Sequence, residues 1–123
     1  MVFLDANILI EIALGRSRYK KIEKLLSAQS DTALSILSVH LLIYFGLKSG
    51  IDIKLLEAIA EKHQILDITY DDYLWAKKNC VNNDFEDALQ VARAIRGGAT
   101  KVLTIDRDMV KNYGDVLNFE LIK

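Results

Sequence analysis

The first seven residues limit the fold more than any other stretch of the chain. Residues 1–4 are Met-Val-Phe-Leu, an apolar run without polar alternation, and Asp5 and Asn7 follow it closely. Such runs are typical of parallel strands that helices cover on both faces, and ligands of these sheets bind beyond the carboxyl ends of the strands. The stretch therefore predicts a central strand at residues 2–5 that delivers Asp5 and Asn7 to a site. The alternative is that one of these side chains only caps the helix that follows.

The remaining patterns predict an α/β chain in which strands and helices alternate. Further strands are expected at residues 32–36, 65–69 and 101–105. Helical periodicity predicts helices at residues 8–14, 17–28, 38–47, 51–62 and 84–96, and another from residue 70 to the region 79–83. The helix at residues 38–47 is apolar nearly all round, so we expect it to be either deeply buried or shared with a partner chain.

The composition fits one domain spanning residues 1–123. The chain has 123 residues with 51% hydrophobic content, which is enough apolar material for a core of ordinary size. Its only cysteine, Cys80, excludes an intrachain disulfide, and no apolar stretch is long enough to span a membrane. The N-terminus also lacks the features of a signal peptide. We therefore expect a cytoplasmic protein in a reducing compartment.

The net charge of the chain is too close to zero to attract nucleic acid to the molecule as a whole. Sixteen basic and seventeen acidic residues leave a net charge of -1, so any contact with nucleic acid requires a local basic patch. The most basic run falls at residues 16–21, and such a run is either a solvated helix face, which is the commoner case, or a contact surface. The candidates for a nucleic-acid contact are Arg16, Arg18, Lys20, Lys21, Arg93, Arg96 and Arg107.

Two later stretches carry acids in positions that match Asp5. Asp84 and Asp87 are three residues apart at the start of a predicted helix, a spacing that puts both carboxylates on one face of its first turn. The pair also fits a helix cap, with Asp84 at the N-cap and Asp87 at N3, and the two roles are compatible. The last predicted strand ends at Asp106 and so repeats the pattern of the first strand.

Carboxylates gathered from these positions predict a metal site. Clustered carboxylates repel one another, and their pKa values rise unless a cation neutralises them. Oxygen ligands without a cluster of Cys and His favour Mg²⁺ or Mn²⁺ over zinc. Such an ion polarises a phosphoryl oxygen and makes hydroxide from bound water, which is nuclease chemistry. Asp71 and Asp72 are instead expected to be first-turn acids that the helix dipole favours.

These motifs resemble those of the PIN domain family, and most of all those of its VapC-type toxins. The resemblance rests on Asp-Ala-Asn at residues 5–7, Asp-Phe-Glu-Asp-Ala-Leu at residues 84–89 and Thr-Ile-Asp at residues 104–106. Their order and spacing and the length of the chain agree, so the resemblance covers essentially the whole chain. It implies a three-layer α/β/α sandwich around a central parallel sheet. It also implies a Mg²⁺- or Mn²⁺-dependent endoribonuclease that forms a homodimer and is inhibited by a small cognate antitoxin.

The resemblance assigns roles to seven residues. The catalytic acids are Asp5, Asp84, Asp87 and Asp106, of which Asp5, Asp87 and Asp106 bind the metal, and the supporting residues are Asn7, Thr104 and Asp108. One position departs from the family's pattern, which usually has a glutamate on the helix after the second strand. The nearest residues here are His40, Leu41 and Leu42, and this departure predicts weak metal binding. His40 is either a substitute ligand or, as is commoner for a lone histidine on an apolar helix, a hydrogen-bonded core residue.

Three alternative functions fit the same pattern of strands and acids to different degrees. A receiver-like signalling domain also places acids at strand ends. Such domains have a phospho-acceptor aspartate after a mid-chain strand, whereas this chain has Tyr70 after the predicted strand at residues 65–69. A phosphate-binding NTPase is excluded because the chain has no Gly-rich loop with Lys-Ser/Thr. The serious competitor is a degenerate PIN fold that binds RNA or a protein partner without cleavage.

Overall fold

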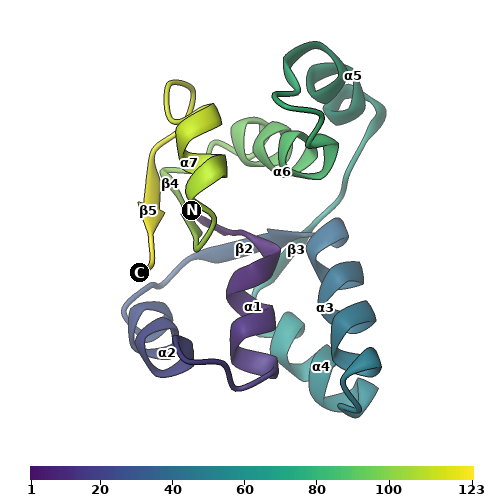
Figure 1. Cartoon of the computed structure of the whole chain (residues 1–123), viewed down its shortest axis with the longest axis vertical. Helices are drawn as coiled ribbons and strands as arrows, with labels where there is room; N and C mark the ends of the chain where they lie inside the picture. The colour runs from purple at the N-terminus through teal and green to yellow at the C-terminus, as the bar shows by residue number, and fades with distance from the viewer.

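A five-stranded parallel sheet forms the centre of the molecule, which the computed structural model describes over residues 1–123 (Figure 1). Its strands are β1 (Val2–Leu4), β2 (Thr32–Ser35), β3 (Gln64–Leu66), β4 (Lys101–Thr104) and β5 (Phe119–Leu121), in the order β3-β2-β1-β4-β5. All neighbouring strands run parallel. Parallel neighbours need crossover connections, and helices supply each of them here.

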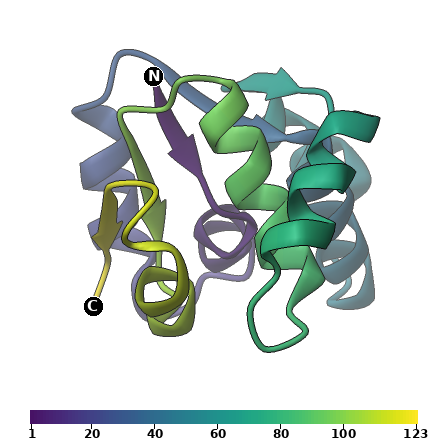
Figure 2. The same cartoon turned by 90° about the horizontal axis from the view of Figure 1, so that it is seen from above.

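Helices cover both faces of the sheet, and Figure 1 shows one helical layer below it and one above it. The lower layer consists of α1 (Ala6–Ala13), α2 (Tyr19–Ser27), α3 (Ile36–Lys48) and α4 (Ile53–Glu61). The upper layer consists of α5 (Tyr70–Asn79), α6 (Phe85–Arg96) and α7 (Arg107–Tyr113). Figure 2 shows α6 between α7 and α5 in this upper layer. The predicted three-layer α/β/α sandwich is confirmed.

Side chains of the central strands alternate between two apolar cores. Leu4, Leu34 and Leu103 lie in the core on the side of α1 to α4, whereas Phe3 and Val102 lie in the core on the side of α6. All five are at most 2% exposed. Because apolar side chains are buried on both faces of β1, residues 1–4 show no polar alternation.

The order of strands reverses at β1. β2 and β3 lie on one side of β1, while β4 and β5 lie on the other, so the carboxyl ends of β1 and β4 are neighbours. Leu4 pairs with Leu103 in the register of these two strands. Asp5 therefore emerges beside Thr104, at the switch point where open α/β sheets bind ligands.

Several elements differ from the sequence predictions. Strand β3 covers residues 64–66 and not residues 65–69. The chain leaves the sheet early because the carboxylate of Asp72 accepts a hydrogen bond of 2.8 Å from the N–H of Thr69 and fixes the start of α5. The sequence patterns also did not predict α7 or β5. These elements are only seven and three residues long, which is too short for a clear periodic signal.

Helix α3 is not deeply buried. Only Ser38, Leu42 and Gly46 are buried, while Tyr44 and Leu47 are 46% and 48% exposed. Gly46 lets α4 pack closely, because a Cβ at this position would clash with the side chain of Leu56. Deep burial of α3 was therefore a wrong alternative, and its use as a contact surface stays a prediction. None of the helices, α3 included, combines the length and the apolar character needed to cross a membrane.

Candidate active site

Asp5 has two structural roles at the end of β1. Its Oδ1 accepts a hydrogen bond of 2.8 Å from the N–H of Ala6 at the start of α1, and its Oδ2 accepts one of 2.7 Å from the hydroxyl of Thr104. The residue is only 6% exposed. Burial raises the pKa of Asp5 to about 6, against the lowering effect of both hydrogen bonds. The side chain thus caps α1 and also tethers the end of β1 to β4.

Thr104 and Asp106 organise the end of β4. Thr104 Oγ1 accepts a hydrogen bond of 3.0 Å from the N–H of Asp106, whose Oδ1 accepts two bonds, of 2.9 and 3.3 Å, from backbone N–H groups in the first turn of α7. Asn7 Oδ1 accepts a longer bond of 3.5 Å from the N–H of Ile105. Asp108, predicted as a supporting residue, contributes a backbone N–H to this arrangement and keeps its side chain exposed.

Helix α6 begins with two aspartates at the same edge of the sheet. Asp84 is the N-cap, and its Oδ1 accepts a hydrogen bond of 3.1 Å from the N–H of Asp87. Asp87 is 8% exposed, and its pKa is raised to about 8 by burial and then by the charges of Asp5, Asp84 and Asp106. Near neutral pH, Asp87 therefore holds a proton unless a cation offsets these charges.

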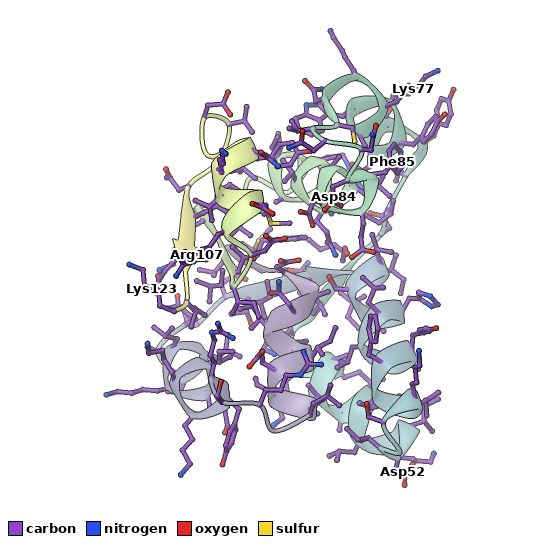
Figure 3. All side chains as sticks on the ribbon, in the orientation of Figure 1. Asp52, Lys77, Asp84, Phe85, Arg107 and Lys123 are labelled. Carbon is purple, nitrogen blue, oxygen red and sulfur yellow. The ribbon has the colours of Figure 1, made fainter.

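All four predicted acids line one cavity of about 350 Å³ at the carboxyl edge of the sheet. The lining residues are Asp5, Ala6, Asn7, Ile10, Leu41, Phe45, Asp84, Glu86, Asp87 and Asp106. Figure 3 shows Asp84 on the side of α6 that faces α1. A larger cavity of about 510 Å³ lies between α2 and β5, and none of the predicted acids line it. Segments far apart in sequence thus bring the four acids together in one place.

A family model for the PIN domain matches residues 2–115 of the chain. The chain belongs to the PIN domain family. A toxin-antitoxin complex from Klebsiella pneumoniae is similar, with 17% identity over 100% of this chain and 98% of that chain and a TM-score of 0.79. VapC20 from Mycobacterium tuberculosis, a sarcin-ricin loop cleaving toxin, has 16% identity over 90% of this chain and 94% of that chain, with a TM-score of 0.77. VapBC2 from Rickettsia felis, bound to a DNA fragment from its promoter, has 17% identity over 100% of both chains, with a TM-score of 0.66.

At these identities the solved structures show a shared PIN fold and no more. Comparison with curated proteins finds no match. Family and architecture are therefore settled, whereas the chemistry of this PIN domain depends on its own residues.

The cavity of this PIN domain contains one acid that the sequence patterns did not single out, Glu86. Its pKa is raised by burial and by the charge of Asp84. The available signal was its position inside the Asp-Phe-Glu-Asp motif, directly before Asp87. Helix α3 contributes only Leu41 and Phe45 to the lining, and both are apolar. The acids of the cavity therefore come from the strand ends and from α6 alone.

His40 does not line the cavity. The residue is exposed, and its ring stacks on that of Tyr44 with 6.3 Å between the ring centroids. Helix α3 turns Leu41 and not His40 toward the acids. Both alternatives for His40, the metal ligand and the hydrogen-bonded core residue, are therefore wrong.

The donor set of the cavity fits a hard divalent cation. It offers carboxylate and amide oxygens, and a cation would relieve the repulsion that raises the pKa of Asp87. In the conformation of the structure, no three acidic, histidine or cysteine side chains converge closely enough to surround an ion. Mg²⁺ tolerates such a site because it keeps several waters and needs only one or two carboxylates together with substrate phosphate. The candidates to hold it, alone or in pairs, are Asp5, Asp87 and Asp106.

Five of the seven predicted RNA-contact residues lie outside α6. Arg16, Lys20, Lys21 and Arg107 are exposed, and Arg18 is partly buried with its Nη1 3.6 Å from the carboxylate of Glu11. Figure 3 shows Arg107 on the same side of the molecule as the C-terminal Lys123. Lys21 Nζ donates a hydrogen bond of 3.2 Å to the backbone oxygen of Lys123, whereas Arg16, Lys20 and Arg107 make no ion pair. All five stay candidates for contact with a phosphate backbone.

The other two, Arg93 and Arg96, connect α6 to the start of α5. Arg93 is 8% exposed, with its Nε 3.6 Å from the carboxylate of Asp67. Arg96 donates hydrogen bonds of 2.9 Å to Asp72 and 3.0 Å to Asp67. Because Arg93 is buried and the guanidinium group of Arg96 is engaged by two carboxylates, we leave both out of the RNA surface. Asp72 is a first-turn acid of α5, as expected, and also completes a capping box with Thr69; it does not line the cavity.

Proposed function

We propose that this PIN domain is an endoribonuclease that depends on Mg²⁺ or Mn²⁺. Asp5, Asp87 and Asp106 carry the proposal, because three separate elements bring them to one cavity with Asp84 beside them. When bound, the cation would stabilise charge on a phosphoryl group and lower the pKa of an attacking water molecule. The similar VapC20 structure, described as that of a sarcin-ricin loop cleaving toxin, supports RNA as the substrate.

The chain's own residues would prepare the cavity for this reaction. The hydroxyl of Thr104 and the N–H of Ala6 hold the carboxylate of Asp5, so Asp5 needs little reorganisation. Asp87, whose pKa is raised to about 8, would release its proton as the cation binds. Asn7 uses its carbonyl oxygen to accept from Ile105, which leaves its NH₂ group to donate to a phosphate oxygen.

The same proposal makes this protein the toxin of a toxin-antitoxin pair, a single domain of residues 1–123 in the cytoplasm. The similar Klebsiella pneumoniae structure is described as a toxin-antitoxin complex, which supports a small antitoxin as partner. Exposed apolar side chains of α3, among them Ile36, Tyr44 and Leu47, offer a surface for a homodimer or for an apolar antitoxin segment.

Binding of RNA or of a protein partner without cleavage is a second candidate function, and two observations favour it. Helix α3 presents Leu41 to the cavity at a position near which the family usually has a glutamate. In addition, no three potential ligands converge on one point. A weakened metal site on an intact PIN fold would produce this arrangement.

Cleavage assays on purified protein separate the two functions. The wild-type protein is expected to cut single-stranded or structured RNA with Mg²⁺ or Mn²⁺ and to stop when the metal is chelated. Asp5→Asn should abolish cleavage, whereas Asp115→Asn, the same change at an exposed residue outside the cavity, should not. RNA that is bound but left uncut with both metals would support the binding function instead.

A further inference from the structure

The carboxylate of Glu86 has no structural partner in the fold. Glu86 is the second residue of α6 and lies between Asp84 and Asp87 in the sequence. Its side chain lines the same cavity as theirs. Acids in a first helical turn commonly serve the cap or the helix dipole. Here Asp84 already provides the cap, and no ion pair joins Glu86 to a basic side chain. Glu86 therefore adds negative charge to an acidic cavity without a stabilising contact within the protein.

Glu86 also differs from Asp5, Asp84 and Asp106 in its freedom to move. Asp5 is held by Thr104 and Ala6, and Oδ1 of Asp106 is held by two backbone N–H groups. Oδ1 of Asp84 is held by the N–H of Asp87. Glu86 is exposed, and its longer side chain places the carboxylate on one more rotatable bond than an aspartate has. Glu86 is the acid of this cavity with the longest reach.

The four aspartates of the cavity alone do not surround a cation. No three potential ligands converge on one point, and α3 lines the cavity only with Leu41 and Phe45. We infer that Glu86 moves toward Asp5 and Asp87 when a divalent cation enters and supplies a further oxygen ligand from α6. A carboxylate is the ligand that a hard cation such as Mg²⁺ or Mn²⁺ prefers. This inference rests on the proposed function, because it concerns the same metal site.

Binding of Mn²⁺ to the purified, RNA-free protein tests the role of Glu86 directly. Glu86→Gln keeps the size of the side chain and removes its charge, so the fold should tolerate it. It is expected to weaken Mn²⁺ binding ~10-fold, as loss of a metal-supporting group commonly does. Glu61→Gln, the same change at an exposed residue of α4, should leave Mn²⁺ affinity unchanged. Free Mn²⁺ measured by electron paramagnetic resonance gives each affinity, and equal affinities for Glu86→Gln and wild type would overturn the inference.

RNA cleavage by the same preparations separates this inference from the proposed function. Glu86→Gln should need ~10-fold more Mn²⁺ than the wild type for half-maximal cleavage. If the wild type binds Mn²⁺ and leaves RNA uncut, the nuclease function fails, while weaker binding by Glu86→Gln still supports the ligand role. If the wild type cuts RNA and Glu86→Gln binds Mn²⁺ equally well, the nuclease function stands and the ligand role is overturned. A wild-type protein that binds no Mn²⁺ would overturn both.

Discussion

The hydroxyl of Thr104 donates a hydrogen bond of 2.7 Å to Oδ2 of Asp5 and thereby joins the ends of β4 and β1. Oγ1 of Thr104 also accepts a hydrogen bond of 3.0 Å from the N–H of Asp106. One buried hydroxyl thus connects two of the three acids proposed to bind the metal. The placement of Asp5 relative to Asp106 therefore depends on a residue that carries no charge.

Thr104→Val tests this connection, because it removes the hydroxyl with little change of volume. We expect a loss of about 1–2 kcal/mol in the free energy of unfolding, since buried polar groups on Asp5 and Asp106 lose their partner. The pKa of Asp5 should rise further above its value of about 6, because the lost hydrogen bond lowers it. The acidic limb of the pH–rate profile should then move to higher pH. Thr104→Ser retains the hydroxyl and should behave like the wild type; an unchanged pKa of Asp5 by NMR in Thr104→Val would contradict the prediction.

Without a cation, the free energy of unfolding should fall as pH rises from about 4 to about 8. Asp5 and Asp87 have pKa values of about 6 and about 8 in the folded protein, both raised above 3.8 by burial. In this range the folded protein holds more protons than the unfolded chain, so a rise in pH favours unfolding. Thermal unfolding over a pH series measures the trend, and Mn²⁺ should restore stability mainly at the upper end.

Asp87→Asn is the matched variant for this pH dependence. It should flatten the pH trend and stabilise the cation-free protein at about pH 8 by about 1–3 kcal/mol, while abolishing cleavage. Asp71→Asn, the same change at an exposed first-turn acid of α5, should preserve the wild-type trend. Stability that increases with pH in the cation-free wild type would show that Asp87 is not held in its neutral form.

Leu41→Glu should tighten binding of Mg²⁺ and Mn²⁺, because Leu41 lines the cavity and a carboxylate there adds an oxygen ligand. The expected gain is on the order of tenfold in affinity, measured by calorimetry without RNA. His40→Ala should leave both affinity and cleavage nearly unchanged, since His40 lies outside the cavity. Tight metal binding by the wild type that disappears in His40→Ala would contradict the structure of α3.

The surface basic residues should set the salt dependence of RNA binding. The residues to be replaced by Gln are Arg16, Arg18, Lys20, Lys21 and Arg107. Replacing a residue that contacts phosphate should reduce the slope of log affinity against log salt concentration by roughly one unit. Replacing Lys77 and Lys78, exposed on α5, should leave the slope unchanged. A slope that stays the same after all five changes would mean that the basic run is solvated surface.

Association of the chain should depend on the exposed apolar side of α3. Tyr44→Asp combined with Leu47→Asp is expected to convert a homodimer into a monomer, because charges would enter a buried apolar contact. Sedimentation velocity measures the change. Val116→Asp is the control, since Val116 is 47% exposed on the connection between α7 and β5. A wild-type protein that sediments as a monomer would remove the homodimer from the proposed function.

The architecture and the positions of the acids were predictable because strand ends are strongly marked in this sequence. Buried parallel strands show as short apolar runs; Asp5 stands directly after β1, and Asp106 is the second residue after β4. Spacing of three residues likewise predicted that Asp84 caps the backbone of Asp87. In each case a local pattern determines a local geometry.

Glu86, His40 and Arg93 could not be placed in the same way. Whether Glu86 turns toward the cavity depends on the rotation of α6 over the sheet, which long-range packing determines. His40 and Leu41 are adjacent, and only the packing of α3 decides which of them faces the acids. Arg93 became a buried partner of Asp67 because α5 packs against α6, a contact between segments that no spacing rule connects.

Three of the four aspartates in the cavity also cap helices: Asp5 caps α1, Asp84 caps α6 and Asp106 caps α7. Alanine at any of these positions would therefore remove a cap worth about 1 kcal/mol together with the carboxylate, and a lost activity could then reflect poor folding. Asparagine caps a helix about as well as aspartate does. Asparagine variants are thus the suitable inactive baits for isolating an uncut RNA or an antitoxin from cells, because they remove the charge and keep the three helix starts.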